Sequence, residues 1–87
     1  MNDDQKIEIG VTLRELRDNT GKGRQELADI CNLDVSQLTK IENGTSEPGL
    51  ITIFRLADGL DMRPGALVDI IYDRLRSKGL LDDFQLH

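Results

Sequence analysis

Few side chains in this chain could carry covalent or metal chemistry, and the sequence does not bring them together. The single cysteine, Cys31, has no second thiol with which to form an internal disulfide. The single histidine, His87, is the last residue, and one thiol with one imidazole is too small a ligand set for zinc. The sequence contains no glycine-rich phosphate loop and no nucleophile with a base nearby. It therefore predicts a protein that is not an enzyme and that needs no metal or cofactor.

Length and composition favour one small globular domain. The chain has 87 residues, 38% of them hydrophobic and 31% charged, which suits a folded core rather than a disordered tail. Apolar runs reach only three residues, whereas a membrane span needs about 20 and a secretion signal roughly 7 to 15. We therefore expect a cytoplasmic protein with no membrane partner.

Apolar residues recur with helical spacing between glycine and proline breakers. Ile9, Leu13 and Leu16 fall on one face of a helix, and nowhere do four to eight residues alternate as in a strand. The sequence therefore predicts an all-α fold. Five helices are expected between seven breakers, which are Gly21, Gly23, Gly44, Pro48, Gly49, Pro64 and Gly79.

The later helices have recognisable ends and inner faces. Asp34 suits the N-cap of the third helix, because a carboxylate can accept the free amides of a first turn. Pro64 suits the first turn of the fifth helix, since proline has no amide to satisfy. The inner face of the fifth helix is expected to carry Leu67, Ile71 and Leu75. The fourth helix is expected over about 50–60, with an inner face formed by Leu50, Ile53, Leu56, Ala57 and Leu60.

Residues 24–43 carry the most specific pattern. Two short helices that cross at a tight turn need a small residue at the crossing, and Ala28 supplies it. Asn32 stands where the turn needs a positive φ, which asparagine tolerates well. Apolar residues flank the turn and anchor the second helix; they are Leu27, Cys31, Leu33, Leu38 and Ile41.

This pattern resembles the helix-turn-helix of the Cro and phage-repressor family, whose domain is called lambda-repressor-like. The resemblance covers roughly residues 9–68 and rests on Ile9-Gly10, residues 13–17, Gly21, residues 26–28, residues 41–44, Pro48, Leu56-Ala57 and Leu60. It implies a compact five-helix DNA-binding domain over residues 1–78, with the motif at 24–43 and an extended fifth helix. Residues 79–87 would form a C-terminal tail for dimerisation or for docking a partner.

The resemblance also implies how the chain meets DNA. In the family, the second helix of the motif lies in the major groove. Carried over, the residues that face the bases are Val35, Ser36, Gln37, Thr39 and Lys40. Gln37 would pair with adenine, Lys40 with guanine, and Val35 would contact a thymine methyl group. The residues that contact phosphates would be Arg24, Asn43, Thr45 and Ser46. Arg17 and Glu42 occupy the family positions of a partly buried ion pair with a structural role.

Charge and several substitutions separate this chain from that pattern. Eleven basic and sixteen acidic residues give a net charge of −5, which argues against coating nucleic acid by bulk charge. Residues 22–47 hold three basic and five acidic residues, so weak non-specific binding with a shallow salt dependence is expected. Gly23 is a weaker cap than the usual Ser or Thr, and Arg24 replaces the usual Gln with a charged side chain that can still reach a phosphate.

Apolar residues beyond the motif need a surface to cover them. The candidate dimer residues are Ile51, Tyr72, Leu75, Leu80, Leu81, Phe84 and Leu86. A two-fold homodimer would place two reading helices about 34 Å apart, which matches a palindromic operator. The alternative is that these residues fold back on their own domain.

Three functions remain open from the sequence. The first is a dimeric regulator of transcription, most simply a repressor, whose partner is double-stranded DNA. The second is the antitoxin of a toxin–antitoxin pair, which binds its operator and docks a toxin through the C-terminal tail. The third is a helix-turn-helix domain used for protein contacts, which the acidic motif leaves open.

Overall fold

Five helices make up residues 3–81, the part of the chain that this computed structural model describes. They are α1 (Asp3–Thr20), α2 (Arg24–Cys31), α3 (Val35–Glu42), α4 (Leu50–Gly59) and α5 (Pro64–Ser77). No strand occurs in this described range, so the predicted all-α fold of five helices is confirmed. None of these helices is long and apolar enough to cross a membrane.

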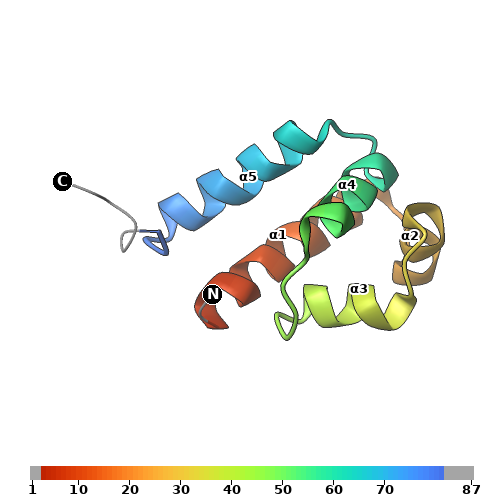
Figure 1. Ribbon diagram of the computed structural model, residues 1–87, viewed down its shortest axis with the longest axis horizontal. Coiled ribbons are helices and arrows are strands. Elements are labelled where there is room, and N and C mark those ends of the chain that lie inside the picture. Colours follow the sequence, from red (N-terminus) through yellow and green to blue (C-terminus); the bar gives the residue numbers. More distant parts are fainter. Residues whose placement is uncertain (1–2, 82–87) are drawn as a thin grey trace.

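The first helix connects the two halves of the fold. α1 packs against α3 on one side and against α5 on another, while α4 packs against α2 and α5 (Figure 1). The short helices α2 and α3 lie against each other at one end of the molecule (Figure 1). Eight residues are too few for a stable isolated helix, so packing against α1 and α4 must hold this pair in place.

The core is formed by the apolar stripes that the sequence indicates. Ala28, Leu38, Leu56 and Leu67 have no exposed surface, and the stripes of α1 and α5 pack around them. Leu50 is the exception, because 65% of it is exposed although it was expected on the inner face of α4. Helical spacing places Leu50 only at the edge of the buried stripe, and at a first turn packing rather than spacing decides burial.

The connections confirm the expected turn residues but correct one cap. Asn32 adopts the left-handed conformation with φ 57°, and the amide of Leu33 returns to the carbonyl of Ala28 at 2.8 Å. Gly79 also has a positive φ, 73°, where α5 ends. Asp34 is the N-cap residue of α3, yet its side chain makes no capping hydrogen bond. Asp34 is exposed, so the expected hydrogen bond from a first-turn amide to its carboxylate is wrong, although its position as N-cap residue is confirmed.

The end of α5 and the residues after it fold back on their own domain. Leu75 is only 8% exposed, and Leu80 and Leu81 pack partly buried against the core. Gln5 Nε2 donates to the carbonyl of Leu80 at 2.8 Å and so ties α1 to this segment. The side chain of Leu75 is therefore used in its own core, and its role in dimerisation stays a prediction that this packing does not favour. The dimer candidates Phe84 and Leu86 lie outside the described residues.

Candidate functional site

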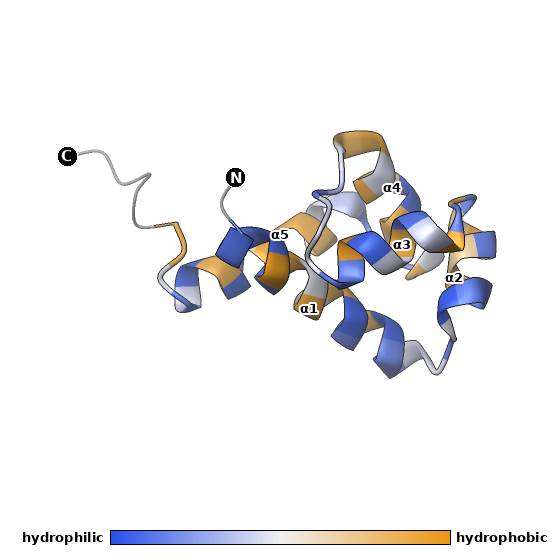
Figure 2. Ribbon diagram, turned by 90° about the horizontal axis from the view of Figure 1, so that it is seen from below, coloured by the Kyte–Doolittle hydropathy of each residue, from blue (hydrophilic) through white to orange (hydrophobic). Residues whose placement is uncertain are grey.

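The eight residues of α3 divide into a buried face and an exposed face. Leu38 and Ile41 are at most 1% exposed and fix the helix to the core. Ser36, Gln37 and Lys40 are exposed on the other face. Viewed from below, α3 lies in front of the other helices, with hydrophilic and apolar residues interspersed along it (Figure 2). The exposed face offers a hydroxyl, an amide and an ammonium group, which together can donate to and accept from the edges of bases.

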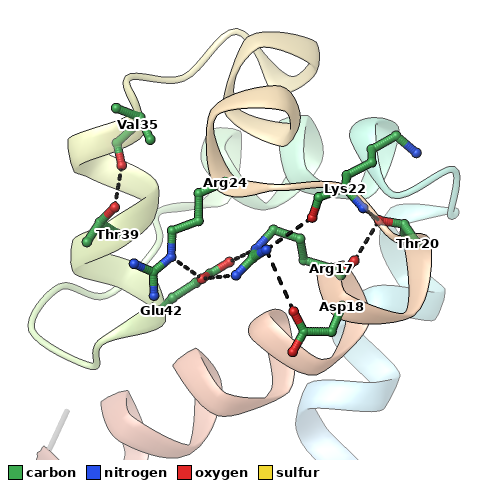
Figure 3. Close-up of polar contacts among 8 residues, drawn as sticks. All are labelled: Arg17, Asp18, Thr20, Lys22, Arg24, Val35, Thr39 and Glu42. Atoms are coloured by element: carbon green, nitrogen blue, oxygen red, sulfur yellow. Dashed lines mark hydrogen bonds and ion pairs between the residues drawn. The ribbon is translucent and has the colours of Figure 1, made fainter.

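Two of the five predicted base-facing residues are half-buried and make contacts within the domain itself. Val35 is half-buried and packs against the core. Thr39 is also half-buried, and its hydroxyl donates to the carbonyl of Val35 at 2.8 Å (Figure 3). Gln37 approaches α4, where its Nε2 lies 3.5 Å from Thr52 Oγ1. The side chains with the most freedom to meet a partner are therefore Ser36, Gln37 and Lys40.

A buried carboxylate anchors the C-terminal end of α3. The side chain of Glu42 has no exposed surface, and Arg17 of α1 donates two hydrogen bonds to its carboxylate. Arg17 Nε lies 2.7 Å from Oε2 and Nη2 lies 3.0 Å from Oε1 (Figure 3). Arg17 Nη1 also donates to the carbonyl of Lys22 at 3.1 Å. The structure thus places Arg17 and Glu42 in the kind of ion pair that the family resemblance implies, and that pair joins α1 to α3.

A second arginine shares the same carboxylate. Arg24, the first residue of α2, donates from Nε to Glu42 Oε1 at 2.8 Å (Figure 3). Its side chain is 29% exposed, against 10% for that of Arg17. Sequence reasoning gave Arg24 only a phosphate-binding role and missed this contact. Arg24 lies 18 positions before Glu42, and no helical spacing relates two residues on different helices, so the sequence carries no signal for it.

The two arginines keep Glu42 ionised. Burial alone would raise the pKa of the Glu42 carboxyl group, but the hydrogen bonds from Arg17 and Arg24 outweigh it and leave the pKa below its usual value. The hydrogen bond to Glu42 raises the pKa of Arg17 despite the opposing effect of burial. At neutral pH, the two arginines and Glu42 therefore meet as charged groups where α1, α2 and α3 come together. The exposed carboxylate of Asp18 also approaches this group, with Oδ1 3.7 Å from Arg17 Nη1 (Figure 3).

The loop after α3 holds the other predicted phosphate contacts. Asn43 and Thr45 are exposed and Ser46 is half-buried. The backbone amide and the hydroxyl of Thr45 both donate to the carbonyl of Lys40, at 3.0 and 3.1 Å. Gly44 makes the turn with φ 79°. This loop begins directly after Glu42, so it lies at the same end of α3 as the arginine pair.

Exposed apolar residues gather on α4 and α5. Ile51 is 60% exposed and Tyr72 is 52% exposed, so these two of the predicted dimer residues are accessible. Pro48, Ile53 and Val68 belong to the lining of one open apolar pocket, which connects the start of α4 with α5. We use the name α4–α5 face for the exposed apolar residues of these helices, which are Leu50, Ile51, Phe54, Val68 and Tyr72.

The described residues contain no cluster of three or more side chains that could hold a metal ion. Cys31 is buried, and burial raises the pKa of its thiol, which favours a packing role over reactivity. The exposed face of α3, the arginine pair and the adjoining loop are thus the candidate site, and they offer hydrogen bonds and positive charge rather than catalytic groups.

Comparisons with known proteins identify a family and a similar solved structure, and one comparison is negative. Residues 13–67 match the sequence model of a family described as Helix-turn-helix. The fold is similar to the crystal structure of the restriction-modification controller protein C.AhdI from Aeromonas hydrophila. That match has 36% sequence identity and a TM-score of 0.68, and it covers 74% of this chain and 96% of that one. A comparison with curated protein sequences finds no match.

Proposed function

Because this chain belongs to the Cro/C1-type helix-turn-helix family of DNA-binding transcription regulators, we propose that it binds a palindromic operator as a homodimer and represses transcription there. The observation that carries this proposal is the division of α3. Its inner side chains hold it to the core, while Ser36, Gln37 and Lys40 extend from an exposed surface. That arrangement suits a helix that enters the major groove as a rigid body.

The proposed contacts follow from the chemistry of each side chain. Gln37 has an amide that can pair with adenine through two hydrogen bonds, and Lys40 can donate to the acceptors of guanine. Ser36 can donate to or accept from any base, whereas half-buried Val35 and Thr39 sit closer to the core and contribute shape and a methyl contact. The phosphate contacts would come from residues around the motif, namely Arg24, Asn43, Thr45 and Ser46.

The exposed apolar residues of the α4–α5 face support the homodimer in this proposal. This face exposes large apolar side chains in two helices that already pack against each other, and such patches favour association. A second copy would cover them and pair two copies of α3 on one side of the duplex. The similarity to a restriction-modification controller protein favours a regulator of that kind. Leu80 and Leu81 pack on their own core, so up to residue 81 no observation favours a toxin-binding tail.

The direct test is selection of bound fragments from a random pool of duplex DNA, followed by affinity measurements on the enriched sequence. We expect enrichment of a palindrome whose half-sites are about one helical turn apart. Failure to enrich any sequence, together with no binding to random duplex at low salt, would contradict the proposal. That outcome would favour the use of this domain for protein contacts.

A double variant tests the assignment of α3. Gln37→Ala with Lys40→Ala removes two exposed side chains, so we expect unchanged folding and a loss of operator affinity of at least about tenfold, since each base contact contributes about 1–3 kcal/mol. The matched control is Gln25→Ala with Lys78→Ala, which removes the same two residue types from exposed positions on α2 and after α5. Operator binding by the first variant at the strength of the control would show that α3 does not read the bases.

A further inference from the structure

Arg24 uses only part of its hydrogen-bonding capacity within the domain. A guanidinium group carries five N–H donors in a planar fork, and the bond to Glu42 takes the Nε donor. Figure 3 shows the two terminal nitrogens of Arg24 on the side away from Arg17. With 29% of its side chain exposed, Arg24 can bind a second anion while it keeps its contact with Glu42.

At this junction Arg24 has fewer anionic partners within the described residues than Arg17 has. Both arginines share the ionised carboxylate of Glu42, but Arg17 Nη1 also lies 3.7 Å from Asp18 Oδ1. Arg17 is the more deeply buried of the two, with 10% of its side chain exposed, and its Nη1 donates to the carbonyl of Lys22. Arg24, which within residues 3–81 pairs with Glu42 alone and is 29% exposed, is therefore the more accessible of the two cations. An accessible cation is notable here because residues 22–47 hold more acidic than basic residues.

The position of Arg24 matches the path of a duplex along α3. Glu42 is the last residue of α3, and Lys40 lies two positions before it on the exposed face. The terminal nitrogens of Arg24 therefore lie beside the end of the reading helix, next to the loop that begins at Asn43. A DNA backbone that passes this end of α3 presents phosphates, the anions for which a guanidinium fork is well shaped.

We propose that Glu42 is a positioning residue for DNA binding, because it fixes the guanidinium of Arg24 so that Nη1 and Nη2 bind one backbone phosphate. This inference rests on the proposed function, since it assumes a duplex against α3. The same carboxylate holds Arg17, so a single buried side chain sets both the packing of α1 against α3 and the place of a phosphate contact. A lysine at position 24 would keep the charge but would lack the fork that binds both anions at once.

Three variants of the full chain test this inference on the selected operator and on random duplex. Arg24→Ala removes charge and fork, Arg24→Lys keeps the charge, and Arg76→Ala removes one exposed cation from α5 as the matched control. Affinities are measured over a range of salt concentrations, because the negative slope of log K against log salt becomes shallower by about 0.9 for each lost phosphate contact. A purely structural role for Arg24 would leave that slope unchanged.

The expected results separate the possible roles of Arg24. Arg24→Ala should bind both DNAs roughly tenfold or more weakly, with a slope about one unit shallower, while Arg76→Ala keeps the slope of the original chain. Arg24→Lys should lose most of the affinity that Arg24→Ala loses. An unchanged slope in Arg24→Ala would overturn the phosphate contact, and full affinity in Arg24→Lys would overturn the positioning by Glu42.

Hydrogen exchange followed by NMR spectroscopy tests the hydrogen bond between Arg24 Nε and Glu42 directly. The side-chain Nε–H signal of Arg24 should be protected from exchange in the free protein and should remain protected in the DNA complex. Loss of protection on binding would mean that Arg24 leaves Glu42 to reach DNA, which contradicts the inference. If the original chain binds neither the selected operator nor random duplex at low salt, the proposed function is contradicted as well. The contradicting results for the Arg24 variants and for the Nε–H signal would overturn this inference alone.

Discussion

At the scale of single residues, the carboxylate of Glu42 decides how the motif is held. A carboxylate without exposed surface is costly unless cations and hydrogen bonds compensate it. Arg17 and Arg24 supply three hydrogen bonds between them, and no buried side-chain nitrogen or oxygen within residues 3–81 lacks a partner. Removal of one arginine should therefore cost more than the loss of an ordinary surface charge.

Arg17→Ala should lower the free energy of unfolding by about 3–5 kcal/mol at pH 7, because it leaves a buried carboxylate with only one cation. Arg14→Ala is the matched control, since Arg14 is exposed on the same helix and its loss should change stability by less than about 0.5 kcal/mol. Urea denaturation followed by circular dichroism measures both. Equal stability of the two variants would mean that the buried pair contributes nothing specific.

Lowering the pH should reduce the difference in the free energy of unfolding between Arg17→Ala and Arg14→Ala. The pKa of Glu42 is lowered in the folded state, so its ionised form stabilises the fold above its unfolded value of about 4.5. That contribution is lost as pH falls through the lower folded pKa. The cost of Arg17→Ala should therefore be largest near pH 7 and shrink as pH falls below about 4.5, whereas the effect of Arg14→Ala should stay small throughout. Denaturation at several pH values checks this trend.

At the scale of helices, the approach of α1 to α3 depends on one glycine. A methyl group at Gly10 would lie 2.5 Å from the carbonyl oxygens of both Ile41 and Glu42. These are backbone atoms at the end of α3, so they cannot rotate away as a flexible side chain would. The close contact brings Arg17 and Glu42 within reach of each other only because position 10 has no side chain.

Gly10→Ala should therefore destabilise the fold by about 1–3 kcal/mol, as expected for overpacking, even though alanine is the better helix former. Gly65→Ala in α5 is the control, because a methyl group there has no neighbouring atom within 4 Å. That variant should be neutral or up to about 1 kcal/mol more stable. Thermal unfolding compares them, and equal or higher stability of Gly10→Ala than of Gly65→Ala would show that α1 and α3 separate freely.

Local patterns predicted the helices but not the contacts between them. The breakers and apolar stripes gave all five helices, and Asn32 gave the left-handed turn, because spacing and backbone preference are local properties. The exposure of Leu50, the burial of Leu75 and the contact between Arg24 and Glu42 depend on how separate helices meet. The Arg17–Glu42 pair was anticipated only through the family resemblance. The base-facing assignments remain predictions, since exposure of a side chain does not identify the base it reads.

At the scale of the whole molecule, the surface presents two different regions. The exposed face of α3 and the arginine pair are polar, whereas the α4–α5 face is apolar. The proposed dimeric regulator would need both, because one region would contact DNA and the other would join two copies. The net charge of −5 makes local placement of the cations more important than their number.

Ile51→Asp with Tyr72→Asp should weaken self-association at least tenfold, because each buried apolar side chain contributes about 1.5–3 kcal/mol and a carboxylate opposes burial. Ile30→Asp is the control, since Ile30 is 52% exposed on α2 and is not part of the α4–α5 face. Sedimentation equilibrium over a range of concentrations measures the monomer–dimer balance. A balance that matches the control would place the dimer contact elsewhere.

The division of α3 into a buried face and an exposed face has a consequence for how the target sequence of such a regulator could change during evolution. The side chains proposed to read DNA lie on the surface, while Leu38 and Ile41, which anchor the helix, are buried. Replacements at positions 36, 37 and 40 should therefore change stability by less than about 0.5 kcal/mol each, so under the proposed function new target sequences would be acquired by a few surface replacements on an unaltered scaffold.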